Sequence, residues 1–153
     1  MKECSVCKES TLIFFKVIDN KKYWKCSNCH SKLLGEQHYI SSIDEKKHYL
    51  KHENNIFDEG YKSFLLKLLN PIKKKISLGS KGLDFGCGYE PVLSQMCLSE
   101  GFSMDKYDPY FFPEKKIFLN KYDFILCSET IEHFYKPFEE FIKLDKLLKK
   151  GGW

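Results

Sequence analysis

The sequence contains no arginine. All 25 basic residues among its 153 are lysines, set against 21 acidic residues, for a formal net charge of +4. Arginine reads phosphates and base edges through paired hydrogen bonds, so its absence and the mild net charge give no strong nucleic-acid signature. No run of about 18 apolar residues is present, and the first residues, Met1 to Cys4, lack the apolar stretch of a secretory signal. We therefore expect a cytoplasmic protein that does not cross a membrane.

Cysteine, in contrast, is plentiful, with seven residues. Four of them form two C-x2-C pairs, Cys4 with Cys7 and Cys26 with Cys29. In a cytosolic chain this spacing favours one tetrahedral Zn²⁺ over disulfides. Between the pairs, two apolar strand-like runs, from Leu12 to Ile18 and from Tyr23 to Lys25, flank the turn at Asp19 and Asn20. Residues 1–35 are therefore predicted to form a zinc ribbon, with a closed metal site that serves structure or recognition.

Residues 36–55 are predicted to form a helical connector, and residues 56–70 an amphipathic helix that ends at Pro71. His48 and His52 lie four positions apart in the connector. This spacing would place a metal on one helical face, but two solvated or partly buried histidines in a charged helix explain it more simply.

From Lys81 onward, strand-like and helix-like segments alternate. The stretches "GLDFG", "FSMDKYD", "KIFL" and "YDFILCS" are predicted strands, and residues 91–100 and about 137–150 are predicted helices. Alternation of this kind implies a parallel sheet with right-handed crossovers. The predicted fold class is α/β, with an N-terminal zinc ribbon followed by a partial Rossmann-like sheet and its flanking helices.

The turn after the first of these strands lacks the third glycine of a dinucleotide-binding motif. Gly86 and Gly88 fit G-x-G-x-x-G, but Pro91 stands at the third position. That pattern argues against a nicotinamide cofactor, whose pyrophosphate needs the helix packed close to the strand. A cofactor without phosphates, such as S-adenosylmethionine, still needs the tight turn. Asp108 ends the next strand, 24 residues beyond Asp84, where an acid accepts hydrogen bonds from ribose hydroxyls.

The stretches "LDFGCG", "YDPYF", "YDFILCSETIEHF" and "LLKKGG" resemble the successive motifs of class I S-adenosylmethionine-dependent methyltransferases, over residues 56–153. With its N-terminal cysteines the chain is similar to small bacterial methyltransferases that carry a zinc ribbon. The family fold has a seven-stranded sheet, and this sequence supplies about the first four strands. We therefore expect the domain to be incomplete at the C-terminus.

The resemblance also implies a set of cofactor-binding residues. It implies that Asp84, Gly86 and Gly88 line the methionine and ribose side, and that Asp108 holds the ribose diol. Residues from Cys127 through Ser128 to Glu129 would flank the transferring methyl group. Tyr61 would cover the cofactor.

Glu129, Glu132 and His133 share one face if "SETIEHF" is helical. Three interpretations stay open. The first is a second divalent-metal site, because E-x-x-E-H resembles the metal-binding motif of small-RNA 3′-end and ubiquinone-pathway methyltransferases. The second is His133 as a metal-free general base beside Glu129. The third is a structural role, in which Glu132 and His133 cap the loop and helix next to the pocket.

The functional hypothesis is S-adenosylmethionine-dependent methyl transfer to an unidentified acceptor, which is a small molecule, a protein or RNA. The ribbon would aid folding or acceptor docking. The alternative is a non-catalytic zinc-ribbon binding protein whose degenerate Rossmann-like domain is a scaffold.

Overall fold

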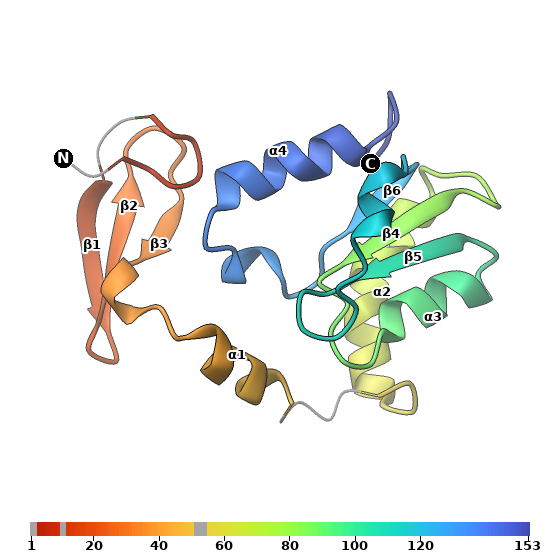
Figure 1. Ribbon diagram of the computed structural model, residues 1–153, viewed down its shortest axis with the longest axis horizontal. Helices are drawn as coiled ribbons and strands as arrows, with labels where there is room; N and C mark the ends of the chain where they lie inside the picture. Colours follow the sequence, from red (N-terminus) through yellow and green to blue (C-terminus); the bar gives the residue numbers. More distant parts are fainter. Residues whose placement is uncertain (1–2, 10–11, 51–54) are drawn as a thin grey trace.

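The computed structural model describes residues 3–9, 12–50 and 55–153. A small antiparallel sheet at the N-terminus and a larger α/β unit are joined by a helical connector (Figure 1). His52 lies outside the described residues, so its predicted pairing with His48 is not tested. None of the helices in the described ranges is both long and apolar enough to cross a membrane.

The N-terminal unit is a three-stranded antiparallel sheet in the order β1-β2-β3. Its strands are β1 (Leu12–Ile18), β2 (Lys21–Cys26) and β3 (Lys32–Leu34). The turn between β1 and β2 has positive φ at Asp19 (47°) and Asn20 (60°), as a two-residue type I′ hairpin requires. The predicted hairpin is confirmed. Strand β3 adds a third strand that was not predicted from the sequence.

The connector holds the short 3-10 helix η1 (Glu36–His38) and helix α1 (Ser42–Tyr49). The Ser41 hydroxyl caps α1 by accepting the backbone N–H of Asp44 at 3.2 Å. The predicted helical tendency of this segment is therefore correct.

Helix α2 spans Glu59–Lys73 and starts at the cap Asp58, whose Oδ1 accepts the Tyr61 N–H at 2.9 Å. The prediction that this helix ends at Pro71 is wrong, because Pro71 lies inside its last turn. Leu65 and Leu69 on the same helix are buried in the core. This packing outweighs the one backbone hydrogen bond that a proline removes near a helix end.

The α/β unit contains a parallel three-stranded sheet in the order β5-β4-β6. Its strands are β4 (Lys81–Phe85), β5 (Ser103–Tyr107) and β6 (Phe124–Leu126), with helix α3 (Val92–Ser99) between β4 and β5 and helix α4 (Pro137–Leu147) after β6. The sheet confirms the predicted α/β class and puts β4 at its centre (Figure 1).

The predicted strand "KIFL" is wrong, because Lys115–Leu119 forms a 3-10 helix, η2. Ile117 in this segment is buried against the sheet. The Tyr122 hydroxyl oxygen lies 2.8 Å from both the Ile117 carbonyl oxygen and Oδ2 of Asp105, the two acceptors within reach of its single proton. Side-chain contacts therefore hold the short segment between β5 and β6 in place, and this segment contains no strand of the parallel sheet. Within the described residues the parallel sheet has three strands instead of the expected four.

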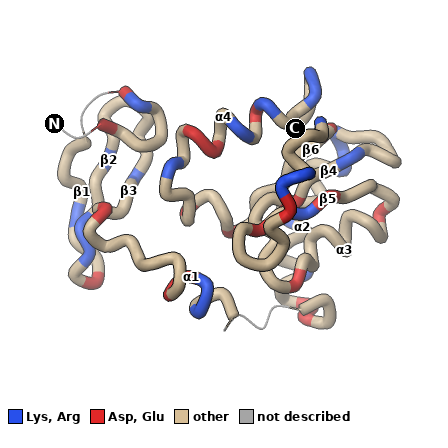
Figure 2. The backbone as a smooth tube through the Cα atoms, in the orientation of Figure 1, with Lys and Arg blue, Asp and Glu red and all other residues tan. Residues whose placement is uncertain are grey.

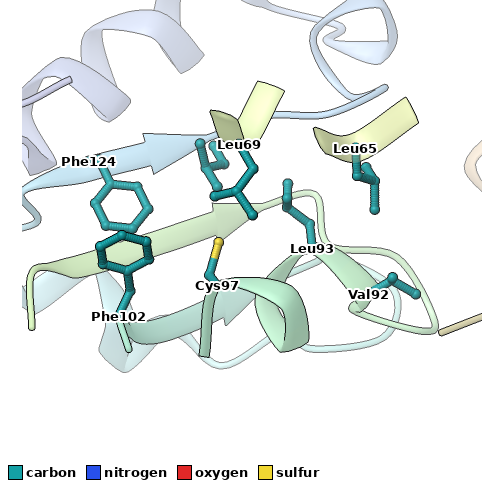
Figure 3. Packing of buried hydrophobic residues seen from close by; sticks show 8 residues of the cluster. Leu65, Leu69, Val92, Leu93, Cys97, Phe102 and Phe124 are labelled. Atoms are coloured by element: carbon teal, nitrogen blue, oxygen red, sulfur yellow. The ribbon is translucent and has the colours of Figure 1, made fainter. Parts of the chain in front are cut away.

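Apolar residues cover both faces of this sheet. On one face, α2 and α3 pack with β6 in a cluster that Figure 3 shows from close by, made of Leu65, Leu69, Val92, Leu93, Cys97, Phe102, Phe124 and Leu126. On the other face, η2 and α4 cover Leu83 and Phe85 of β4. Burial on both faces explains why β6 is a continuous apolar run, FIL.

Candidate functional site

The four cysteines of the two C-x2-C pairs converge at one end of the ribbon sheet. Their sulfur atoms all lie within 4.8 Å of one another. The Sγ atoms of Cys4 and Cys29 are 3.7 Å apart, as are those of Cys7 and Cys26. A tetrahedral ion with metal–sulfur bonds of about 2.3 Å separates its ligands by about 3.8 Å. The predicted ligand set therefore fits one tetrahedral metal ion, and the N-terminal unit has the fold of a zinc ribbon.

The two knuckles are built alike. Lys8 and His30 each follow the second cysteine of a pair, and both have positive φ, 59° and 61°. This left-handed residue turns the chain back around the sulfurs. In the second knuckle the Asn28 N–H points to the Cys26 Sγ at 3.4 Å. The ligand positions therefore follow from local backbone conformation, which explains why spacing alone predicted them.

A second candidate site is a cavity of about 860 Å³ at the carboxyl ends of the parallel strands. Strands β5 and β6 lie on opposite sides of β4 in the sheet. The carboxyl end of β4 is therefore a topological switch point, where α/β proteins bind ligands. The loops after all three strands contribute to the cavity wall, and α1, α2 and α4 add side chains to it.

The turn after β4 forms the cavity floor and requires both of its glycines. Gly86 and Gly88 have φ of 81° and 69°. A Cβ on Gly86 would lie 2.3 Å from the side chain of Thr130, whereas a Cβ on Gly88 would meet no atom within 4 Å. Gly86 therefore allows the β6 loop to pack against the turn, and Gly88 leaves open space above it.

Asp108 joins the β4 turn to the loop after β5. Its carboxylate is nearly buried, with Oδ2 accepting the Gly88 N–H at 3.1 Å. The other oxygen, Oδ1, accepts the N–H groups of Tyr110 at 2.8 Å and Phe111 at 3.2 Å. A carboxylate offers about four acceptor positions, so Asp108 retains capacity for a ligand hydroxyl at the rim of the cavity.

Not all of the residues implied by the methyltransferase resemblance lie at this cavity. Gly86, Gly88, Asp108, Ser128 and Tyr61 line it. Two others, Asp84 and Cys127, lie elsewhere, as described next.

Asp84 points to the opposite side of β4 from its neighbours Leu83 and Phe85, toward α3. Its Oδ2 accepts the backbone N–H of Ser94 at 3.2 Å and the Ser94 hydroxyl at 2.8 Å. Burial raises the pKa of Asp84 to about 6. Asp84 therefore anchors the start of α3 beneath the cavity floor. Cys127 packs against the core cluster under α4, and burial raises its pKa to about 12, as expected of an inert thiol.

The Glu129, Glu132 and His133 cluster does not form on one helical face. Glu129 has φ of 49°, outside a helix, and only Ile131–His133 form a 3-10 turn, η3. Glu129 and His133 line the cavity. In the ranges that the structure describes, the four cysteines are the one group of three or more potential ligands that meets at metal-binding distance. The second metal site thus has no assembled ligand set here.

Sequence reasoning missed a cavity residue in the connector, Glu45 of α1. It is 6% exposed, although it belongs to a charged stretch that reads as a solvated helix. Its two carboxylate oxygens accept the hydroxyls of Tyr49 and Tyr110. Tyr110 is 65 positions away along the chain, so no local pattern could have identified the contact.

The ribbon contacts the start of α4 directly. The Phe138 N–H donates to the Ser5 carbonyl at 3.2 Å, and Lys8 pairs with Glu139 at 3.3 Å. Figure 2 shows acidic and basic positions interspersed along α4. The Tyr135 hydroxyl also donates to the Ile40 carbonyl in the connector at 2.7 Å. The ribbon and connector are therefore joined to the segment that forms one wall of the cavity.

A comparison with curated proteins returned no match. A family model described as a methyltransferase domain matches residues 49–153, which is more than half of the chain. This match includes the glycine turn, Asp108 and the segment after β6, and it confirms the resemblance drawn from the motifs. The chain therefore belongs to the methyltransferase-domain family.

Proposed function

We propose that this protein transfers a methyl group from S-adenosylmethionine to an acceptor bound in the same cavity. The observation that carries the proposal is the meeting of Gly88 and Asp108 at the rim of an 860 Å³ cavity. Sites for small molecules occupy roughly 300–1,000 Å³. The cavity is thus large enough for a cofactor together with part of an acceptor.

The residues at the cavity fit this cofactor. The open space above Gly88 admits a ligand close to the backbone, and the remaining acceptor positions of Asp108 suit ribose hydroxyls. Tyr61 would cover the bound cofactor from α2. When bound, S-adenosylmethionine supplies an electrophilic methyl group on a sulfonium sulfur.

The chain itself would contribute alignment, exclusion of water and a proton acceptor. Methyl transfer is an in-line displacement, so most of the rate acceleration would come from holding the acceptor in line with the methyl group. His133 and Glu129 lie on the cavity wall and are the proposed acid–base groups. The acceptor is proposed to be a small molecule, or a protein or RNA group that reaches into the cavity.

For the ribbon we propose Zn²⁺ as the bound ion, with a structural role. Four cysteines complete its coordination shell and leave no open position for catalysis. The contacts of Ser5 and Lys8 with α4 support a role in positioning the cavity wall or docking the acceptor.

Equilibrium dialysis of the full chain against labelled S-adenosylmethionine, with excess NAD⁺ as competitor, tests the cofactor. Saturable retention that NAD⁺ does not reduce is the expected result. Displacement by NAD⁺ would favour a nicotinamide enzyme. No retention by a folded, metal-loaded chain would favour the non-catalytic alternative.

A further inference from the structure

Glu45 and Asp108 are the two charged residues of the cavity lining that are nearly buried. The Glu45 side chain is 8% exposed. The Tyr49 hydroxyl donates to Oε1 at 3.1 Å, and the Tyr110 hydroxyl donates to Oε2 at 2.6 Å. A buried carboxylate is stable only when hydrogen bonds satisfy it, and these two tyrosines supply them from α1 and from the loop after β5.

His133 completes this group from the loop after β6. Its Nδ1 lies 3.7 Å from Oε1 of Glu45, and its ring meets the Tyr49 ring edge-on with centroids 5.4 Å apart. The distance is that of an ion pair and is longer than a hydrogen bond. Contacts between catalytic groups are commonly long without substrate and tighten when it binds.

The two tyrosines remain hydrogen-bond donors to this carboxylate. Burial, with the neighbouring charge of Glu45, raises the pKa of both Tyr49 and Tyr110. Neither hydroxyl therefore ionises near neutral pH, and Glu45 is held in place from two sides. The carboxylate is a fixed acceptor opposite Nδ1 of His133.

We propose that Glu45 is a positioning residue that holds His133 in the tautomer with the proton on Nδ1, so that Nε2 is the proton acceptor for the methyl acceptor. This inference rests on the proposed methyl transfer and deepens it. A carboxylate behind the Nδ1–H fixes the tautomer and stabilises the imidazolium that forms, as in other histidine–carboxylate pairs.

The role of Nε2 indicates the class of acceptor. A base is useful only where the acceptor carries a proton at neutral pH, which points to a hydroxyl or an ammonium group. The bond from acceptor oxygen or nitrogen to the methyl carbon forms while the carbon–sulfur bond breaks, and the sulfur keeps that electron pair. The acceptor proton moves to Nε2 of His133, and the resulting imidazolium faces the Glu45 carboxylate.

Glu45 also lies before residues 49–153, the part that the family model matches. Helix α1 therefore brings a residue from the connector into the methyltransferase cavity. The hydrogen bond from Tyr135 to the Ile40 carbonyl holds the segment just before α1 against the loop that follows His133.

Imidazole ¹⁵N NMR of the full chain, with labelled histidine, tests the proposal without an acceptor. Spectra are recorded well above the ordinary imidazole pKa of about 6.5, and the His133 signals are assigned with His133→Asn. We expect Nδ1 to be protonated and Nε2 unprotonated in the wild type. We expect Glu45→Leu to abolish this preference, Glu45→Gln to weaken it and Glu59→Gln, an exposed control, to leave it unchanged.

A wild-type His133 that carries its proton on Nε2 would overturn the proposal, whether or not the variants fold. So would an unchanged tautomer in folded Glu45→Leu. Calorimetry with S-adenosylmethionine on the same wild-type sample tests the proposed function separately. A wild-type protein that shows the expected tautomer but does not bind S-adenosylmethionine would refute the proposed function. The proposed role of Glu45 toward His133 would still hold.

Discussion

The backbone N–H of Gly88 donates to Oδ2 of Asp108 across 3.1 Å. This hydrogen bond ties the turn after the central strand β4 to the loop after β5, so the two loops form one rim of the cavity. A Cβ added to Gly88 would meet no atom within 4 Å, whereas Asp108 is nearly buried. A ligand that binds here meets a preformed rim, which lowers the entropic cost of binding.

The glycine turn gives the first prediction, because its two glycines serve different purposes. Gly88→Ala should cost about 1 kcal/mol of stability, from left-handed strain alone, and should weaken S-adenosylmethionine binding by blocking the open floor. Gly86→Ala should cost more, because its Cβ would also overlap Thr130 at 2.3 Å. Denaturant unfolding and calorimetry measure the two effects.

Gly151→Ala is the matched control for this pair. Gly151 also has positive φ, 79°, and also has no atom within 4 Å of an added Cβ, but it does not line the cavity. It should lose as much stability as Gly88→Ala and bind the cofactor normally. Equal cofactor affinity in Gly88→Ala and Gly151→Ala would mean that no ligand approaches Gly88.

The ribbon gives a prediction about metal content. Protein purified without chelator should contain about one Zn²⁺ per chain. Cys26→Ser should lose the ion and unfold the ribbon, because binding free energy at such a site is largely folding free energy. Cys87→Ser, at a cysteine outside the cluster, should keep the ion. A ribbon that stays folded without metal, seen by NMR, would refute the structural role.

Asp84 gives a prediction about pH. Burial raises its pKa from 3.8 to about 6. The folded state therefore binds a proton more tightly than the unfolded state, so this group favours folding at low pH. Its contribution to the free energy of unfolding should decline as pH rises from about 4 to about 6 and stay constant above that.

Asp84→Asn should remove this dependence. The difference in unfolding free energy between Asp84→Asn and wild type, measured by denaturant titration, should move in favour of the variant as pH rises through that window. Effects of pH on the metal site are common to both proteins and cancel in the difference. A difference that does not vary with pH would show that Asp84 titrates normally.

The sequence predicted best those features that depend on local spacing. The cysteine pairs and the turn at Asp19 and Asn20 each arise within a few residues, and the structure confirms them. The methyltransferase motifs placed Gly88 and Asp108 at one cavity because parallel strands align their carboxyl ends on one edge of a sheet.

The features that the sequence did not predict depend on distant contacts. Lys115–Leu119 has the composition of a strand, but the contacts of Tyr122 with Ile117 and Asp105 fix it as a 3-10 helix. Pro71 predicts a helix end, but the helix continues to Lys73 because the burial of Leu69 stabilises its last turns. Glu45 carries no local signal, because its partner Tyr110 lies 65 positions further along the chain.

The most direct test of the account is calorimetric titration of S-adenosylmethionine into the full chain, with Asp108→Ala and Asp108→Asn. Asp145→Ala, at an exposed aspartate of α4 outside the cavity lining, is the control. Hydrogen bonds to a charged group contribute about 1.5–3 kcal/mol. We therefore predict saturable binding to the wild type and the control, and affinity about 10- to 100-fold lower in Asp108→Ala. Folded, metal-loaded Asp108 variants that bind as tightly as the wild type would contradict the account.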